Sequence, residues 1–193
     1  MKVAIVGNSP KVLEEDHGEF IDSHDVVIRC NKGTHRGYEN HVGSRTDYRV
    51  INIHIANLLS NFDSMIQDKH FTDLFDDWAG KKPEDIVEKN ETIVLKDAVD
   101  YTYDKVKFID FHQPARGFAE LNGLQGGLSV GGCAILFAHT TLKYDCMNCF
   151  GFSFYEDNNT CSHYFEKVNN KPISHNHKRE YDLFKQIEGI DFL

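Results

Sequence analysis

The stretch Val3-Ala-Ile-Val-Gly-Asn-Ser9 lies at the start of the chain and decides its fold class. Three of its four apolar residues are β-branched, which predicts a short strand buried on both faces. Gly7 and Asn8 end this strand, and a serine followed by a proline is typical of a helix start. A buried strand, a turn and a helix form the first unit of a parallel sheet, so the chain is predicted to be an α/β protein.

The same alternation of strands and helices continues along the chain. Further strands are predicted at 26–29, 48–53, 93–95, 106–109 and 147–150, and helices at 10–17, 54–78, 133–142 and 180–187. This order predicts a Rossmann-like, mostly parallel sheet with helices on both faces. No linker or internal repeat interrupts the pattern, so residues 1–193 are expected to form a single domain.

Composition and charge exclude several classes of protein. The chain has 193 residues, of which 40% are hydrophobic and 26% charged, the balance of a soluble globular protein. Its net charge of −9 argues against binding to nucleic acid. No apolar run is long enough to span a bilayer, and no signal peptide precedes the first strand, so we expect a cytoplasmic protein with no transmembrane segment.

The cysteines predict reduced thiols and no metal site. Their odd number, five, without a secretory signal argues against a disulfide framework. Cys146, Cys149, Cys161 and His163 have the residue types of a zinc site. However, Cys146 and Cys149 lie on a predicted strand, where residues three apart point to opposite faces.

Two asparagines follow predicted strands directly. Ligands of doubly wound sheets bind at the carboxyl ends of the strands, where Asn8 and Asn31 are expected. Gly7 allows the backbone to approach a phosphate, and an asparagine amide can bond a phosphate or a sugar. Neither a dinucleotide fingerprint nor a Walker lysine loop follows the first strand, and an ordinary turn explains each asparagine when it is taken alone.

The glycine-rich loop Gly126–Gly132 has two interpretations. Its N–H groups and the helix that follows can form an anion site. Alternatively, Gly127-Leu-Ser-Val-Gly131 matches the nucleophile elbow of serine hydrolases, with Ser129, Asp157 and His175 in hydrolase order. An elbow needs a strand before its serine, and residues 120–127 are too polar and too rich in glycine for one. The hydrolase interpretation therefore ranks second.

Histidines in the last part of the chain indicate acid–base chemistry. His163-Tyr-Phe-Glu166 is followed by His175-Asn-His-Lys-Arg-Glu180. Imidazole titrates near neutral pH, so one of these side chains can act as a general base beside a nucleotide pocket. Of the others in the second stretch, His177 is expected to be an exposed helix residue and Glu180 to orient a helix start.

Together these segments resemble glycosyltransferase family 29, the eukaryotic-type sialyltransferases. The family's long motif resembles Val3–Ser9, Ile21–Asn31 and Val42–Thr46, its short motif Ser129–Gly131 with Phe150–Phe152, its third motif His163–Glu166, and its very short motif His175 to Glu180. The segments occur in the family's order. The resemblance implies a GT-A-like variant of the predicted fold.

The resemblance also implies roles for particular residues. His163 would bind the donor phosphate and stabilise the leaving group, and His175 would be the general base. The contacts with the cytidine monophosphate (CMP) part of the donor would come from Asn8, Asn31, Ser129, Gly131 and Gly151.

The predicted function is therefore an inverting, metal-independent glycosyl transfer. Sialic acid, or a related keto-sugar such as Kdo, would move from a CMP-sugar donor to a hydroxyl of a glycan or glycoconjugate acceptor, without a cofactor. The sequence contains no Asp-x-Asp, in agreement with metal independence. The alternatives are a serine hydrolase on Ser129 and a catalytically inactive CMP-binding module.

Two departures from the family pattern motivate the inactive alternative. Val130 stands where the family usually has a threonine, and Val3 and Tyr144 stand where animal members have a disulfide. The membrane anchor and stem of the family are also missing from the sequence. Residues 54–125 match no motif and are expected to supply the acceptor site, with candidates Tyr101, Tyr103, His112, Gln113 and Arg116.

Overall fold

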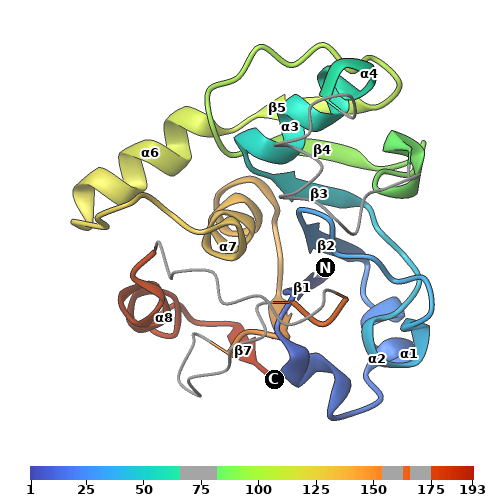
Figure 1. Ribbon diagram of the computed structural model, residues 1–193. Coiled ribbons are helices and arrows are strands. Elements are labelled where there is room, and N and C mark those ends of the chain that lie inside the picture. The colour runs from blue at the N-terminus through green and yellow to red at the C-terminus, as the bar shows by residue number, and fades with distance from the viewer. Residues whose placement is uncertain (66–81, 154–162, 166–174) are drawn as a thin grey trace.

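A seven-stranded parallel sheet forms the centre of the computed structural model, which describes residues 1–65, 82–153, 163–165 and 175–193 (Figure 1). The strand order is β5-β4-β3-β2-β1-β6-β7, and every neighbouring pair is parallel. The strands are β1 Lys2–Val6, β2 Val26–Cys30, β3 Tyr48–Ile51, β4 Thr92–Leu95, β5 Lys107–Asp110, β6 Cys146–Phe150 and β7 Ile190–Phe192. This confirms the predicted α/β fold class.

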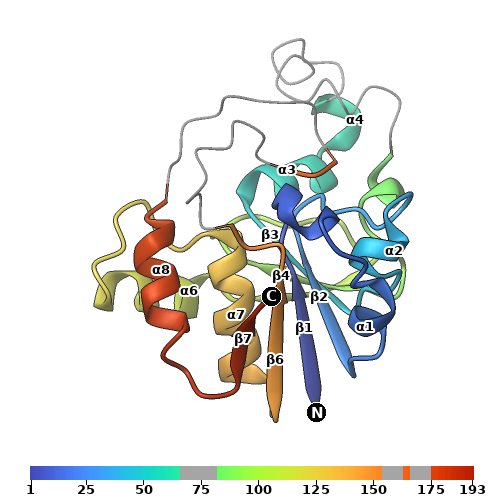
Figure 2. The ribbon, with the colours of Figure 1, turned by 90° about the horizontal axis from the view of Figure 1, so that it is seen from below.

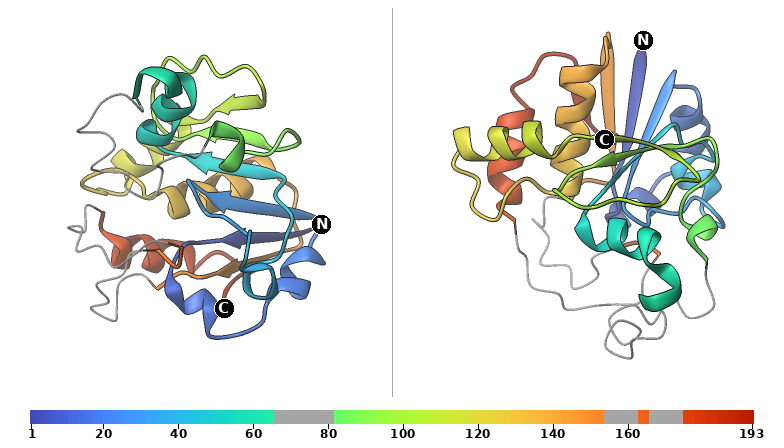
Figure 3. Two further views of the ribbon diagram at one scale, coloured as in Figure 1. Left: turned by 45° about the vertical axis from the view of Figure 1, so that its right-hand side comes forward. Right: turned by 90° about the horizontal axis from the view of Figure 1, so that it is seen from above.

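Helices cover both faces of the sheet, as predicted (Figures 2 and 3). The described helices are η1 Pro10–Leu13, α1 Gly18–Asp22, α2 Glu39–Val42, α3 Ile53–Ser60, α4 Phe62–Met65, η3 Pro83–Asp85, α6 His112–Leu121, α7 Val130–Thr141 and α8 His177–Phe184. Figure 2 shows α6, α7 and α8 on one side and α1 and α2 on the other. In the described part of the chain, none of the helices has the length and apolar character needed to cross a membrane.

Alternation along β1 explains why its whole apolar run is buried. Val3 and Ile5 belong to the core between the sheet and α7, whereas Ala4 and Val6 belong to the core beside α1 and α2. All four are at most 1% exposed. Burying a valine or isoleucine side chain contributes about 1.5–3 kcal/mol, so β1 anchors both layers of helices.

The chain reverses its direction of growth across the sheet between β1 and β6. From β1 it builds outward to β5, and it then returns to place β6 on the other side of β1. The two strand ends are joined by backbone hydrogen bonds, from Gly7 N to Phe150 O (2.8 Å) and from Ser9 N to Gly151 O (3.0 Å). Such a switch point is where doubly wound sheets bind their ligands.

The middle of the chain departs from the predicted elements. The third strand ends at Ile51 rather than at residue 53, because the Asn52 side chain accepts a hydrogen bond from Ile55 N (3.1 Å) and caps α3. The predicted helix over 54–78 is interrupted at Asn61, between α3 and α4, and its remainder from residue 66 lies outside the described residues.

Other differences concern short or disguised elements. Of the helix predicted over residues 10–17, only the short 3-10 helix η1 at Pro10–Leu13 is formed. The sequence patterns do not predict α1, α2, α6 or β7. In α6, Pro114 and Gly117 conceal the helix, although a proline in the first turn costs no hydrogen bond. The last helix begins at His177, three residues before the predicted start, because Asn176 accepts from Arg179 N (3.1 Å).

The switch point leaves no room for a side chain at Gly7, and replacing this residue tests the fold. A Cβ atom there would lie 2.5 Å from Gly151 O, a backbone atom that cannot move alone. We expect Gly7→Ala to lower the free energy of unfolding by about 1–3 kcal/mol, as overpacking does. Urea denaturation measures the change.

Gly117→Ala is the matched control. No atom lies within 4 Å of a Cβ at Gly117, which is inside α6, so alanine should raise the free energy of unfolding by about 0.5–1 kcal/mol. Equal stability of the two variants would contradict the close packing of β1 against the segment after β6.

Candidate active site

Asn8 and Asn31 lie at neighbouring strand ends, as predicted. The Asn8 Nδ2 group donates to Cys30 O (3.1 Å), and its Oδ1 atom is buried and has no hydrogen-bond partner among the described residues. Asn31 has a φ of 47° and is the one non-glycine residue of the described chain with a positive φ. Its Oδ1 atom accepts from Asn52 N (3.0 Å), so its Nδ2 group faces the other way.

The segment that carries His163 is fastened beside Asn8. Tyr164 N donates to Asn8 O (2.9 Å), and the Tyr164 hydroxyl donates to Thr34 O. The Tyr164 ring also packs edge-on against Tyr38, with ring centres 5.0 Å apart. His163, the residue before Tyr164, is therefore held at the same edge as the first two strand ends.

Ser129 connects the starts of two helices. It caps α7 by accepting from Gly132 N (2.9 Å), and its hydroxyl donates to the Glu180 carboxylate, which also accepts from Ser129 N (2.8 Å). Glu180 is 1% exposed, and this burial raises its pKa. The helix start that Glu180 orients is thus that of α7, across the interface from its own helix.

The two halves of the glycine-rich edge pack against each other. A Cβ at Gly131 would lie 2.7 Å from the Phe152 ring. Gly151 has a φ of 67°, and a Cβ there would lie 3.0 Å from Val12 Cβ. The left-handed backbone of Gly151 favours glycine, and a side chain at Gly131 would have to displace the Phe152 ring, because the start of α7 lies close to the end of β6.

His175 is held by the glycine-rich loop in the tautomer that a base needs. Its Nδ1 atom lies 3.2 Å from Gly127 O. A carbonyl only accepts, so Nδ1 carries the proton and Nε2 is left with a lone pair. Burial lowers the pKa of His175 below its usual value, which keeps the ring neutral near pH 7.

The prediction that His177 is an exposed helix residue is wrong. His177 is half-buried at the first position of α8, with its ring 5.7 Å from that of His175. Burial, together with the neighbouring His175, lowers the pKa of His177 to about 4. The turn before α8 folds both imidazoles towards the protein, which sequence spacing does not reveal.

A cavity of about 710 Å³ lies beside His175. Gly127 both lines this cavity and holds His175. Its wall is formed by the end of β4, one face of α6 and the glycine-rich loop: Lys96, Asp97, Ala98, His112, Gln113, Ala115, Arg116, Ala119, Glu120, Gly123, Leu124, Gln125, Gly126, Gly127 and Leu128.

Three of the five acceptor candidates line this cavity, namely His112, Gln113 and Arg116. Tyr101 and Tyr103 do not. They pack with the core beneath α3, where Tyr101 is 9% exposed. The sequence signal that separates the two groups is helical spacing, since the three lining residues fall within two turns of α6.

Geometry removes the basis of the hydrolase interpretation. Residues 122–129 form a loop after α6, so no strand precedes Ser129. The serine is 8% exposed, and its hydroxyl is bonded to Glu180 rather than to a histidine. Asp157, the third member of the supposed triad, lies outside the described residues.

No metal site is found in the part of the chain that the structure describes. Within it, no group of three or more His, Cys, Asp or Glu side chains could hold an ion. Cys146 and Cys149 lie on β6 as predicted and are free thiols, as are Cys30 and Cys133, whereas Cys161 is not among the described residues. Metal independence stays a prediction.

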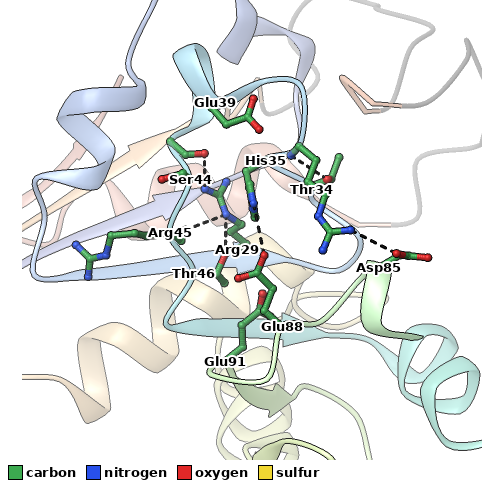
Figure 4. Close-up of polar contacts among 12 residues, drawn as sticks. Arg29, Thr34, His35, Glu39, Ser44, Arg45, Thr46, Asp85, Glu88 and Glu91 are labelled. Carbon is green, nitrogen blue, oxygen red and sulfur yellow. Dashed lines mark hydrogen bonds and ion pairs between the residues drawn. The ribbon is translucent and has the colours of Figure 1, made fainter. Parts of the chain in front are cut away.

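Buried Arg29 joins two segments of the long motif (Figure 4). Its guanidinium donates to Thr46 Oγ1 (2.9 Å) and to the backbone oxygens of Val42 (2.7 Å), Gly43 (3.1 Å) and Arg45 (3.2 Å). His35 Nε2 lies 3.5 Å from Glu88 Oε1, a contact drawn in the same view (Figure 4). The contacts of Arg29 hold residues 42–46 against β2.

A doubly wound sheet with asparagines at its switch-point edge defines an α/β protein with a candidate site where such sheets bind their ligands. Comparison with known proteins specifies the family. The sequence model of glycosyltransferase family 29 (sialyltransferase) matches residues 1–190, and the chain belongs to this family.

Similar proteins cover this chain to different extents. Beta-galactoside alpha-2,6-sialyltransferase 2 of Bos taurus is 46% identical over 52 residues, which are 27% of this chain and 10% of that protein. Beta-1,6-galactosyltransferase GALT29A of Arabidopsis thaliana is 26% identical over 209 residues, 98% of this chain and 51% of that protein. The chain therefore spans at most about half the length of these two relatives.

A crystal structure of a mammalian sialyltransferase has the same fold. It superposes with a TM-score of 0.65 at 20% sequence identity, and the alignment covers all of this chain and 68% of the other. The same fold is found in a mammalian sialyltransferase in complex with Gal-beta-1-3GalNAc-ortho-nitrophenol, with a TM-score of 0.64.

A serine-directed fluorophosphonate probe tests the position of Ser129. Because its hydroxyl is buried and donates to Glu180, we expect no labelling of Ser129 in the folded protein. Mass spectrometry of tryptic peptides measures this, with a known serine hydrolase as the positive control. Stoichiometric labelling of Ser129 that is lost in His175→Ala would instead revive the hydrolase interpretation.

Proposed function

We propose that this chain is an inverting, metal-independent glycosyltransferase that uses a CMP-sugar. The transferred sugar would be sialic acid or a related keto-sugar such as Kdo, and the acceptor would be a hydroxyl of a glycan or glycoconjugate. Membership of family 29 supports glycosyl transfer. The donor, the stereochemistry and the role of each residue go beyond that membership.

The arrangement of His175 is the observation that carries the proposal. Its Nδ1–H group is bonded to the carbonyl of Gly127, a residue that lines a cavity of about 710 Å³, and Nε2 keeps the lone pair that can accept a proton. A neutral imidazole next to a space for a saccharide is what base-assisted attack by a hydroxyl requires.

Each side of the site has a task in the proposed reaction. His175 Nε2 takes the proton of the acceptor hydroxyl as its oxygen attacks the anomeric carbon, and the bond from that carbon to the CMP oxygen breaks. Attack from the face opposite the leaving group inverts the centre. CMP departs as an anion, and the N–H groups near Asn8, Asn31 and His163 would stabilise its charge.

The names of the relatives differ in the sugar that is transferred, so the donor sugar is the main question within the family. The bovine relative is a sialyltransferase, whereas the Arabidopsis relative, which aligns over nearly the whole chain, is a galactosyltransferase. We favour a CMP-sugar because the family resemblance assigns CMP contacts to Asn8, Asn31 and Gly151, which follow the neighbouring strands β1, β2 and β6. Competition between a CMP-sugar and a galactose donor decides which of the two the protein uses.

Thermal stabilisation by nucleotides tests the donor. A ligand at a concentration of 100 Kd stabilises the folded state by about 2.7 kcal/mol, so CMP should raise Tm by several degrees. UMP, AMP and inorganic phosphate serve as controls at the same concentration. A shift by UMP alone would contradict a CMP-sugar donor and would favour a uridine nucleotide, as would turnover of UDP-galactose but not of CMP-sialic acid or CMP-Kdo.

Replacement of His175 tests the general base. His175→Ala should reduce kcat at least about 100-fold, the usual contribution of general base catalysis, while the CMP-induced Tm shift is kept. The inactive-module alternative predicts no turnover by the unmodified protein at all. Undiminished kcat in the variant would exclude His175 as the base.

The pH dependence of kcat/KM provides a second measurement on His175. Activity needs the neutral ring, so kcat/KM falls as the pH drops through the His175 pKa. Because burial lowers that pKa, the acidic limb should lie below pH 6.5. An acidic limb above pH 7 would contradict a buried neutral base.

A further inference from the structure

A fully buried ion pair lies near the edge of the sheet that carries Asn8 and Asn31. Arg49 on β3 donates through Nε and Nη2 to the two carboxylate oxygens of Glu91, at 2.6 and 2.9 Å. The two side chains are 2% and 0% exposed. Glu91 comes directly before β4, so the pair crosses between neighbouring strands.

The remaining nitrogen of Arg49 holds the loop after β2. Its Nη1 group donates to Asn31 O and to Gly33 O, both at 2.9 Å. One planar guanidinium thus fastens a carboxylate on one side and two carbonyls on the other. The rigid fork of arginine allows this combination, which a lysine ammonium cannot reproduce.

Asn31 is the residue that this loop presents. Its left-handed backbone is unfavourable for a side chain other than glycine, and such conformations persist where the surroundings impose them. The surroundings here are Arg49 Nη1 on its carbonyl, Val50 O on its N–H (2.8 Å) and Asn52 N on its side-chain oxygen. The direction of the Asn31 amide therefore depends on Arg49.

Stability alone does not account for the pair. Burying two charges costs desolvation that their attraction only partly returns, and apolar residues of similar size often serve the fold as well. Arg29 occupies the position on β2 that is paired with Arg49, and it is a buried arginine whose contacts serve the fold alone. It holds the segment 42–46 and, among the described residues, makes no hydrogen bond to Asn31 or Gly33.

We propose that Arg49, oriented by Glu91, is a positioning residue that fixes Asn31 for binding of the donor nucleotide. This inference rests on the proposed function, in which Asn31 contacts the CMP part of the donor. Arg49 acts through Asn31 and not on the ligand. Its replacement should therefore change donor binding while acceptor binding stays the same.

The first measurement is the affinity for CMP by titration calorimetry. We expect Arg49→Lys, which keeps the charge beside Glu91, to weaken CMP binding about tenfold, the equivalent of roughly one lost hydrogen bond. The donor KM should rise by a similar factor with the acceptor KM unchanged. Arg29→Lys is the matched control, a buried neighbour in register with Arg49, and should leave the CMP affinity within twofold.

A double-mutant cycle with Asn31→Ala separates positioning from general destabilisation. If Arg49 acts through Asn31, Arg49→Lys should cause little further loss of CMP affinity once Asn31 is alanine. Circular dichroism and a cooperative thermal transition establish that each variant is folded. Should Arg49→Lys fail to fold, the double variant Arg49→Met with Glu91→Leu leaves no unpaired charge and takes its place in both experiments.

The outcomes are distinct. Undiminished CMP affinity in the folded Arg49 variant, additive losses in the cycle, or an equal loss in Arg29→Lys would overturn the positioning role. Absence of CMP binding by the unmodified protein would instead refute the proposed function, and the inference with it. A tenfold loss of CMP affinity in the Arg49 variant, absent in Arg29→Lys and absent when Asn31 is already alanine, supports both the proposed function and the positioning role.

Discussion

The close backbone contact between the ends of β1 and β6 is the constraint on which the rest of the structure depends. A Cβ atom at Gly7 would lie 2.5 Å from Gly151 O, and Gly151 itself has a φ of 67°, which favours glycine. This contact places the glycine-rich segments of distant parts of the chain side by side.

Buried polar groups then fix the loops that the strands leave behind. Arg29, Arg49 and Glu180 are each at most 2% exposed, and each bonds loop or helix-start atoms rather than strand atoms. Because a buried charge must find partners, these side chains tolerate few alternative loop conformations. The site is therefore built on loops that have the rigidity of the core.

Family membership and site geometry answer different questions about this protein. The family model extends over nearly the whole chain, yet the chain is similar both to a sialyltransferase and to a galactosyltransferase. A fold can host several transfers, so the sugar is chosen by contacts at the site. We propose that those contacts occur in the cavity lined by α6 and at the edge that carries Asn8 and Asn31.

Much of this protein could be predicted from local sequence. The apolar run of β1 and the alternation with helices determined the α/β class, and residues following strands, such as Asn8 and Asn31, marked the edge of the sheet. Two kinds of feature are not predicted: an element boundary set by a helix cap, and a helix that contains residues unfavourable for helices. Asn52 ends β3 early, and α6 contains both Pro114 and Gly117, so neither follows from periodicity.

Only the tertiary structure decided how the predicted residues are used. In the tertiary structure Ser129 donates a hydrogen bond to Glu180, and His177 is half-buried. Arg49 forms an ion pair with Glu91, which lies 42 residues further along the chain. Local patterns report hydrophobic burial and backbone preference, which act over a few residues. Hydrogen-bond partners of buried charges are set by which segments the sheet brings together, and no local pattern contains that information.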